Sequence, residues 1–205
     1  MGKSIVIGLT GTSGSGKTTV CEILRMYGCM IINSDKIARV VTEPGSPCLD
    51  ELQAAFGDEI INSDGTLNRR RLGEIAFSSD TLTKKLNSVT HPHIMRRIDS
   101  IINKYKQSGA KIIILDAPQL FEARADSLCD CIAAVIADRR LAKSRIISRD
   151  NIDEKNAENR LSRSHNDDFF MQRADYIIRN DSDFHALENN VAETLDKIKR
   201  AFNIS

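Results

Sequence analysis

A glycine-rich stretch near the start of the chain carries the residue types that bind phosphate. Its residues are Gly11, Thr12, Ser13, Gly14, Ser15, Gly16, Lys17 and Thr18, which match the pattern GxxxxGK(S/T) in full. The backbone N–H groups of such a loop, placed at a helix N-terminus, attract phosphate through unpaired donors and the helix dipole. Lys17 adds a positive charge for the β- and γ-phosphates, and the Thr18 hydroxyl is a natural Mg²⁺ ligand. We therefore predict a nucleoside triphosphate site at this loop, extending to Thr19.

Three carboxylates follow at positions suited to phosphoryl transfer. Two roles fit Asp35, just beyond an apolar run at 30–32: a general base that accepts a hydroxyl proton, or a helix cap, for which Ser34 competes. Asp116 ends the strongest predicted strand, where an acid either helps to hold Mg²⁺ or orients the lysine or a water. Glu122 is either a second carboxylate of the site or an ordinary charge at a helix start.

An arginine-rich helical segment at 139–173 has two interpretations. In a phosphate-transfer protein, such a segment suggests a lid that closes over the site. Alternatively, its arginines lie on a solvated face and pair with Asp150, Asp153, Glu154 and Glu158. The arginines are Arg139, Arg140, Arg145, Arg149, Arg160, Arg163 and Arg173.

The elements that must position these residues alternate between strands and helices. Near-continuous apolar runs at 5–9, 30–32, 111–116, 132–138 and 176–178 predict parallel strands covered on both faces. Helical stretches separate them, among them one from about 81 to 106, which we expect to be interrupted near His91 and Pro92. The pattern predicts an α/β fold with a parallel sheet and a helical, substrate-binding insert between the second and third strands.

Composition excludes several function classes. The 205 residues fit one domain with insertions, and a formal net charge of +1 gives no electrostatic footprint for nucleic acid or an anionic membrane. No apolar run approaches the ~20 residues of a membrane span, and the early first strand leaves no room for a signal peptide. The five cysteines lack CxxC spacing, which favours neither a zinc site nor disulfides. We expect a cytoplasmic protein with reduced thiols.

A phosphate-binding loop serves several classes of protein. A switch GTPase would carry an Asn-Lys-x-Asp motif, but the nearest string, at 103–106, lacks the aspartate. A motor or transport ATPase needs a larger chain or partner subunits. A kinase of a small metabolite fits best, because it needs a loop for ATP, a carboxylate beside the acceptor hydroxyl and arginines around the migrating phosphoryl group.

Several short strings, taken together, resemble the dephospho-CoA kinase family across nearly the whole chain. In order they are Thr10 to Thr18, Asn33 to Arg39, Glu43 to Gly45, Asp64 to Arg70, His91 to Ile94, Pro118 with Leu120 and Glu122, Arg145 with Arg149 and Asp150, and Ala174 to Asn180. The resemblance implies transfer of the ATP γ-phosphoryl group to the ribose 3′-hydroxyl of dephospho-CoA, the last step of coenzyme A biosynthesis. The alternatives are a kinase of another nucleoside or nucleotide, or an ATP-binding regulatory module with little turnover.

The resemblance also implies an architecture and partners. The fold would be a three-layer P-loop kinase fold with a five-stranded parallel sheet. Its core would take about 1–35, 108–138 and 174–205, its helical substrate-binding region about 36–107 and its helical lid about 139–173. ATP and Mg²⁺ are the implied cofactors, and dephospho-CoA is the small-molecule partner of a monomer or weak homo-oligomer.

Residue roles follow from the same resemblance. It favours Asp35 as the base, assigns catalytic roles to Lys17, Arg145 and Arg149, and places Asn180 near the adenine. Thr18 and Asp116 are the candidate metal ligands. The candidate substrate contacts are Asp35, Arg39, Arg69, Arg70, His91, Pro118 and Glu122.

Four positions depart from the family's pattern. Asn33 replaces the first aspartate of its Asp-Ala-Asp motif, which removes one negative charge near the metal or acceptor. Gln119 replaces a leucine, Ser164 stands where the lid commonly has glutamine, and Phe170 stands where a basic residue is usual. The lid and the acceptor surface are therefore where this chain differs most from the family.

Overall fold

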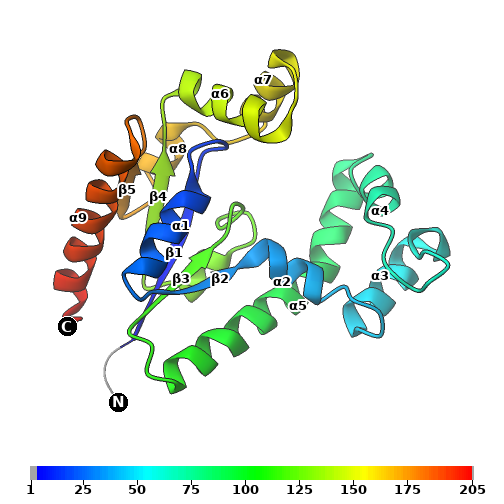
Figure 1. Cartoon of the computed structure of the whole chain (residues 1–205). Helices are drawn as coiled ribbons and strands as arrows, with labels where there is room; N and C mark the ends of the chain where they lie inside the picture. Colours follow the sequence, from blue (N-terminus) through cyan, green and yellow to red (C-terminus); the bar gives the residue numbers. More distant parts are fainter. Residues whose placement is uncertain (1–3, 205) are drawn as a thin grey trace. The chain divides into compact units, whose positions relative to one another are not determined.

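The chain forms two compact units. The computed structural model describes residues 4–204, so positions 1–3 and 205 of the expected core lie outside the described residues. One unit contains the chain up to Ile32 and again from Lys104 onward, and the other contains Asn33–Asn103. Figure 1 shows both units, coloured along the sequence. The expected division into core, substrate-binding region and lid stays a prediction.

Strands and helices alternate in the first unit, whereas the second unit is almost entirely helical. Two elements cross the boundary: β2 ends at Asn33, and α5 runs on to Gln107. The elements of the first unit are β1 (Ile5–Gly11), α1 (Lys17–Met26), β2 (Met30–Asn33), β3 (Ile112–Asp116), the 3₁₀ helix η2 (Ala125–Leu128), β4 (Cys131–Ile136), α6 (Arg139–Asp150), α7 (Glu154–Ser162), α8 (Asp167–Met171), β5 (Tyr176–Arg179) and α9 (Phe184–Phe202). The second unit has α2 (Ser34–Val40), α3 (Pro47–Phe56), the 3₁₀ helix η1 (Asp58–Ile60), α4 (Arg69–Ala76) and most of α5 (Asp80–Gln107).

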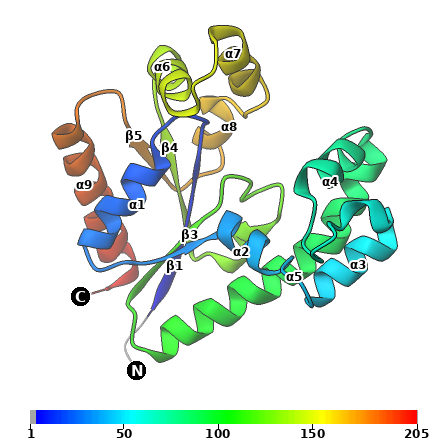
Figure 2. The ribbon, with the colours of Figure 1, turned by 45° about the vertical axis from the view of Figure 1, so that its right-hand side comes forward.

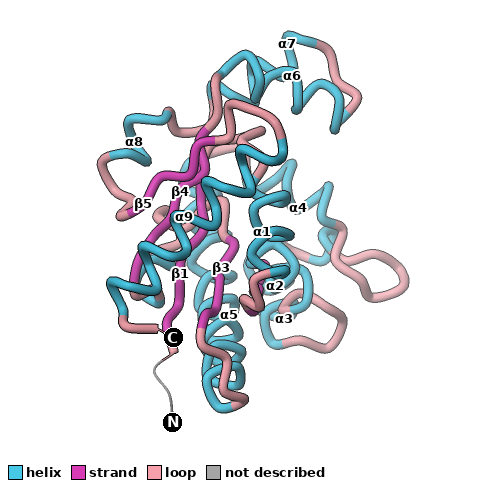
Figure 3. Tube along the Cα trace, turned by 60° about the vertical axis from the view of Figure 1, so that its left-hand side comes forward, coloured by secondary structure: helices cyan, strands magenta, loops and turns pink. Residues whose placement is uncertain are grey.

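A five-stranded sheet in the order β2-β3-β1-β4-β5 organises the first unit. β1 pairs in parallel with β3 on one side and with β4 on the other, and β4 pairs in parallel with β5 (Figure 3). The residues of β1 and β3 are all buried, as expected for parallel strands covered on both faces. The predicted five-stranded parallel α/β fold is confirmed.

The alternation of side chains along β4 assigns the two faces of the sheet. Ala133 and Val135 pack into a cluster with residues of α1 and α9, whereas Ala134 and Ile136 pack against Phe170 of α8. The sheet is therefore the middle of three layers, with its polar crevice at the carboxyl ends of the strands. Figure 2 shows α6 and α7 beyond those ends of β1 and β4.

The second unit has an apolar core of its own. Buried residues of α3, η1 and α4 form its centre, and Leu82, Leu86 and Val89 of α5 pack against them. The turn predicted at Asp64-Gly65-Thr66 is present, and its ends are joined by a bridge between Ile61 and Leu67. The Asp64 carboxylate stabilises this turn by accepting from the Thr66 N–H at 3.0 Å.

The expected interruption near His91 and Pro92 is wrong. α5 is one continuous helix of 28 residues with Pro92 inside it. Proline removes one N–H donor and crowds the preceding turn, which kinks a helix more readily than it ends one when packing holds both halves. The helix changes direction along its course in Figures 1 and 2, in keeping with such a kink.

Two glycine substitutions are expected to change stability in opposite directions. A Cβ on Gly8 of β1 would lie 2.9 Å from both Cys129 Sγ and Leu120 Cδ2. Gly8→Ala should therefore lower the free energy of unfolding by about 1–3 kcal/mol through overpacking. In α4, a Cβ on Gly73 would meet only the Phe77 ring at 3.8 Å. Gly73→Ala should stabilise by about 0.5–1 kcal/mol, because it removes glycine from a helix interior.

Urea unfolding of the two variants beside the parent protein measures both effects. The midpoints should move in opposite directions at an unchanged slope. An unchanged or raised midpoint for Gly8→Ala would show that the packing around Gly8 is not tight, and a lowered midpoint for Gly73→Ala would contradict the gain expected in α4.

Candidate active site

The glycine-rich loop joins the carboxyl end of β1 to the first turn of α1. Its first residue, Gly11, has φ 145°, and a Cβ there would clash with the Val135 carbonyl of β4. The loop begins with a hydrogen bond from the Thr12 N–H to that carbonyl at 3.1 Å. Gly16, at φ 89°, is the last residue before α1 begins at Lys17. The loop thus places backbone donors at a helix N-terminus, as predicted from the sequence.

Helix α6 and Asn180 pack closely against the loop. A Cβ on Gly14 would lie 2.5 Å from the Ala142 carbonyl of α6, and one on Gly16 would clash with the side-chain amide of Asn180. These two glycines are therefore required by the close approach of α6 and Asn180 as well as by their positive φ angles.

Lys17 and Asp116 both act on the thiol of Cys21. Asp116 ends β3 beside Leu9 of β1, is 9% exposed, and forms a side-chain hydrogen bond with Cys21. Burial and the Asp116 charge raise the pKa of Cys21 to about 12, and the nearby Lys17 charge opposes that rise. Lys17 and Asp116, the predicted lysine and the predicted acid, therefore both lie near the Cys21 thiol. Thr18, the other candidate metal ligand, is exposed in the first turn of α1.

Pro118 and Glu122 lie on the segment that follows β3. The Thr10 hydroxyl, next to the loop, donates to the Pro118 carbonyl at 3.2 Å. Glu122 forms an ion pair with His165 at 2.9 Å, and the His165 ring stacks on Phe169 at 3.6 Å between centroids. Neither role considered for Glu122, site carboxylate or helix-start charge, foresaw this pairing with the segment before α8.

The two arginines predicted to be catalytic have different partners. The Arg145 guanidinium of α6 donates to the backbone carbonyl of Asn180 at 3.1 Å and to its side-chain oxygen at 3.3 Å. Arg149 instead makes two hydrogen bonds of 2.8 Å to the carboxylate of Asp150, and Arg160 binds the same carboxylate. The Asp150 contact also raises the pKa of Arg149.

The arginine-rich segment satisfies much of its own charge. Besides the Asp150 pairs, Glu158 binds Arg139 and Glu154 binds Lys143. Such exposed pairs contribute little to stability and are typical of a solvated face. The solvated-face interpretation thus fits Arg149 and Arg139, whereas it does not fit Arg145.

A cavity of about 420 Å³ lies between the start of the loop and helices α6 to α8. Its lining includes Thr12 and Ser13 of the loop and Ser164, His165 and Asp167 from the segment that leads into α8. The Ser164 hydroxyl accepts the Ser13 N–H at 3.3 Å, so the position where the family usually has glutamine contacts the loop here. Phe170, another departure, is buried at 3% exposure beneath the sheet.

Asn33 is the last residue of β2 and immediately precedes α2. Its side-chain oxygen accepts the Lys36 N–H at 2.9 Å, which makes Asn33 the N-cap of the helix. The interpretation of Asp35 or Ser34 as that cap is therefore wrong, because both already lie within the first turn. Asp35 is exposed, and an acid in the first turn interacts favourably with the helix dipole.

Arg39 and Arg69 form a cationic cluster in the second unit. Arg69 donates to the Arg39 carbonyl at 3.3 Å and to the buried Thr42 hydroxyl at 2.8 Å. Burial and the charge of Arg39 both lower the pKa of Arg69. Neither arginine has an acidic partner among the residues that the structure describes. Two neighbouring arginines whose charges are not paired with an acid favour binding of an anion.

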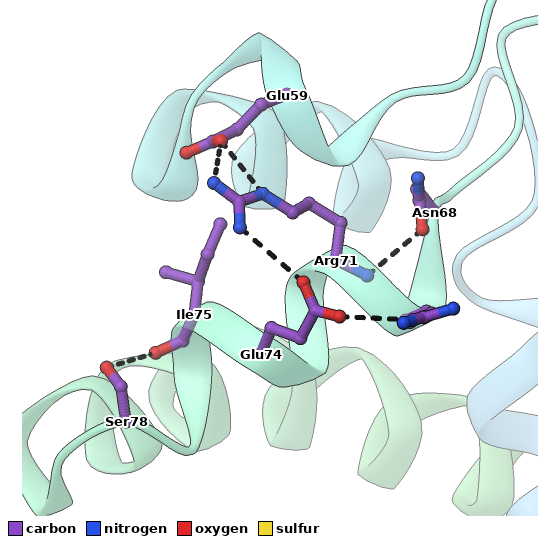
Figure 4. A network of polar contacts seen from close by, with 7 residues as sticks. Glu59, Asn68, Arg71, Glu74, Ile75 and Ser78 are labelled. Atoms are coloured by element: carbon purple, nitrogen blue, oxygen red, sulfur yellow. Dashed lines mark hydrogen bonds and ion pairs between the residues drawn. The ribbon is translucent and has the colours of Figure 1, made fainter.

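The neighbouring arginines of α4 are already neutralised. Figure 4 shows Arg71 bound to Glu59 and Glu74, beside Asn68, which caps the helix. Arg70, the remaining candidate substrate contact, forms an ion pair with Glu74 at 3.1 Å. The structure thus distinguishes Arg69 from the two arginines that follow it in the sequence.

The two histidines of α5 are in different environments. Burial lowers the pKa of His91, which favours the neutral ring near neutral pH. His93 lies 3.0 Å from the Glu51 carboxylate. No group of three or more His, Cys, Asp or Glu residues that could hold a metal ion occurs in residues 4–204.

Sequence reasoning also missed contacts that join distant parts of the chain. It did not foresee the amide of Asn180 on the loop, the Thr42 hydroxyl behind Arg69, or the Ser164 hydroxyl on Ser13. All three join residues far apart in the sequence, and only the position of Asn180 after a predicted strand end offered a signal. No helix in the described part of the chain is long and apolar enough to cross a membrane.

Comparison with known proteins identifies the family. The sequence model of the dephospho-CoA kinase family matches residues 5–186. The dephospho-CoA kinase of Corynebacterium diphtheriae is 38% identical over 188 residues, which cover 92% of this chain and 94% of that protein. The dephospho-CoA kinase of Listeria monocytogenes is 35% identical over 200 residues, which cover 98% of each.

Solved structures share the fold. TT1252 from Thermus thermophilus has a TM-score of 0.82 at 26% identity, covering 96% of this chain and 99% of that one. Dephospho-CoA kinase from Campylobacter jejuni has a TM-score of 0.64 at 22% identity, covering 95% and 97%. At that identity the second likeness shows the fold alone. The phosphate-binding loop, the parallel sheet and the match along nearly the whole sequence lead to one conclusion: this chain belongs to the dephospho-CoA kinase family.

Proposed function

We propose that this protein transfers the γ-phosphoryl group of ATP to the ribose 3′-hydroxyl of dephospho-CoA, giving CoA and ADP. One observation carries the proposal beyond family membership. The phosphate-binding loop leaves β1 where Asp116 ends the neighbouring β3, and Lys17 follows the loop as the first residue of α1. A cation for the phosphates and an acid at the end of the adjacent strand are the parts that phosphoryl transfer from ATP requires.

The transfer exchanges one phosphorus–oxygen bond for another. The acceptor hydroxyl oxygen attacks the γ-phosphorus while the bond from that phosphorus to the β–γ bridging oxygen breaks, and ADP leaves with that oxygen. Asp35 takes the hydroxyl proton as general base. Lys17 and Arg145 stabilise the charge that develops on the migrating group. Arg149 contributes less than Arg145, because Asp150 already neutralises it.

Thr18 and Asp116 fit the Mg²⁺ that this family's chemistry implies. Both offer oxygen donors, which this hard cation prefers, and one belongs to the turn that follows the loop and the other to the end of β3. When bound with ATP, Mg²⁺ supplies charge neutralisation on the β- and γ-phosphates. The base of ATP lies near Asn180, which reaches the loop from the end of β5.

The remaining candidate residues are proposed to contact the acceptor. Arg39 and Arg69 bind the phosphate groups of dephospho-CoA, and His91, Pro118 and Glu122 contact other parts of it. We also propose that the enzyme works in the cytoplasm as a monomer or weak homo-oligomer, in keeping with its five free thiols.

An ADP-release assay with a panel of acceptors tests the function. Dephospho-CoA should stimulate ADP release, whereas adenosine, AMP and shikimate should not. Lys17→Ala should abolish most of the stimulated turnover, because the migrating charge loses its cation. A stimulation by adenosine or AMP alone would indicate a different nucleoside or nucleotide kinase. Tight ATP binding without transfer to any acceptor would indicate a regulatory module.

Removal of the carboxylate at Asp35 tests the base. Asp35→Ala should lower kcat by ~10²–10⁴-fold with nearly unchanged ATP affinity. Asp50→Ala, which removes an acid from the first turn of α3, is the matched control and should leave kcat unchanged. Steady-state kinetics with saturating dephospho-CoA measure both variants. An Asp35→Ala enzyme with the kcat of the parent protein would remove Asp35 from the mechanism.

The cationic cluster yields a prediction about the acceptor. Arg69→Ala should raise KM for dephospho-CoA by about tenfold through loss of a charged hydrogen bond, with little change in KM for ATP. Arg70→Ala is the matched control, because Arg70 pairs with Glu74 and has a side chain that is 91% exposed. Equal effects of the two substitutions on KM for dephospho-CoA would refute the role assigned to the cluster.

A further inference from the structure

The side chain of Asn180 connects three segments of the first unit. Asn180 follows β5, and only 6% of its surface is exposed. Its amide N–H donates to the Ser15 carbonyl in the phosphate-binding loop at 2.8 Å. Its side-chain oxygen and its backbone carbonyl both accept hydrogen bonds from Arg145 of α6. Its backbone N–H is bound to the Ile136 carbonyl at 2.9 Å, so the residue is anchored on the sheet.

The chemistry of these contacts requires an amide. One end of the side chain donates to a carbonyl, and the other accepts from a guanidinium group. An aspartate would retain the acceptor but set a carboxylate oxygen against the Ser15 carbonyl, and a leucine would provide neither contact. Because the residue is buried, loss of either partner leaves a polar group unsatisfied.

Helix α6 is held on the loop beside this contact. The Ala142 carbonyl lies where a side chain on Gly14 would have to fit, and Ile146 is fully buried. Arg145 lies between Ala142 and Ile146 in the sequence, and its guanidinium donates to the Asn180 carbonyl. The first helix of the arginine-rich segment is thus docked on the loop at two neighbouring points.

Within residues 4–204, no acid forms an ion pair with Arg145. Its hydrogen-bond partners are the neutral carbonyl and amide oxygens of Asn180. Arg149, one turn later on the same helix, pairs instead with Asp150. The Asn180 contact therefore fixes the guanidinium beside the loop while leaving its charge for an anionic ligand.

We propose that Asn180 is a positioning residue that holds Arg145 and the phosphate-binding loop in the arrangement that binds MgATP. The proposal rests on the proposed function only in taking ATP as the ligand. Asn180 transmits the position of α6 to the loop through Ser15, and Arg145 is the arginine of the segment that acts on the nucleotide. Arg149 serves the salt-bridge network of α6 and α7.

A double-mutant cycle on nucleotide affinity tests the proposal. Calorimetry with the β,γ-imido analogue of ATP and Mg²⁺ gives the dissociation constant for the parent protein, Asn180→Ala, Arg145→Ala and the double variant. Each single substitution should weaken binding by about tenfold. The double variant should bind no more than about twofold more weakly than the weaker single variant, because both substitutions remove one connected unit.

Two further variants separate positioning from folding. Asn190→Ala is the matched control. The Asn190 amide also donates to a backbone carbonyl at the end of β5, that of Arg179, at 3.0 Å, and within residues 4–204 its side chain forms no hydrogen bond with the loop or α6. It should keep the affinity of the parent protein. Asn180→Asp should keep the thermal midpoint of the ligand-free protein closer to that of the parent than Asn180→Ala does, yet still bind the nucleotide weakly. In turnover, KM for ATP should rise while KM for the acceptor stays constant.

The outcomes are distinguishable from a failure of the proposed function. Affinity losses that multiply to about a hundredfold in the double variant would overturn the proposal, because independent contacts add in free energy. Parent-like affinity of Asn180→Ala would also overturn it. Absence of dephospho-CoA phosphorylation together with a non-additive cycle would refute the proposed reaction and leave the role of Asn180 intact.

Discussion

The close approach of backbone to backbone around the phosphate-binding loop is the constraint on which the active half of this protein depends. The loop must expose its N–H groups on one side, so it is held from the other side by the end of β4, by α6 and by Asn180. Only glycine leaves room for these neighbours at positions 11, 14 and 16. The glycines of the motif are therefore needed for close packing as well as for backbone conformation. The segment after β4 contributes to holding the loop in place.

The distribution of charge separates structural arginines from those that remain able to bind a ligand. Most basic groups of α6 and α7 are neutralised by Asp150, Glu154 and Glu158. Arg145 has neutral partners, and Arg69, which lies near the charge of Arg39, donates to the Arg39 carbonyl and to the buried Thr42 hydroxyl. Bringing like charges together opposes folding unless an anion compensates. This is why the proposed phosphate contacts are Arg39, Arg69 and Arg145 rather than the arginines that are paired with acids.

Sequence patterns predicted the sheet and the loop because both depend on local signals. Apolar runs of strand length and a complete phosphate-loop motif need no knowledge of distant contacts. The prediction failed at Pro92, where packing on both sides keeps one helix continuous, and at the start of α2, where the cap is Asn33 at the end of a strand. The partners of Arg145 and Arg149 could not be predicted either. Acids lie near both arginines in the sequence, and only the fold determines that Arg149 pairs with an acid while Arg145 binds Asn180. The catalytic and binding roles of these residues stay predictions.

The register of β1 bears on how the chain acquires its fold during synthesis. Ile5 pairs with Ile112, and Ile7 pairs with Cys131. During synthesis the central strand β1 therefore cannot pair until more than a hundred further residues have been made. The helices of the second unit bury a cluster drawn from a much shorter stretch, between Val41 and Val89. Short-range contacts close with less loss of chain entropy and form sooner. On the ribosome, the inserted helices thus collapse first, and the first strand made is among the last to find its place.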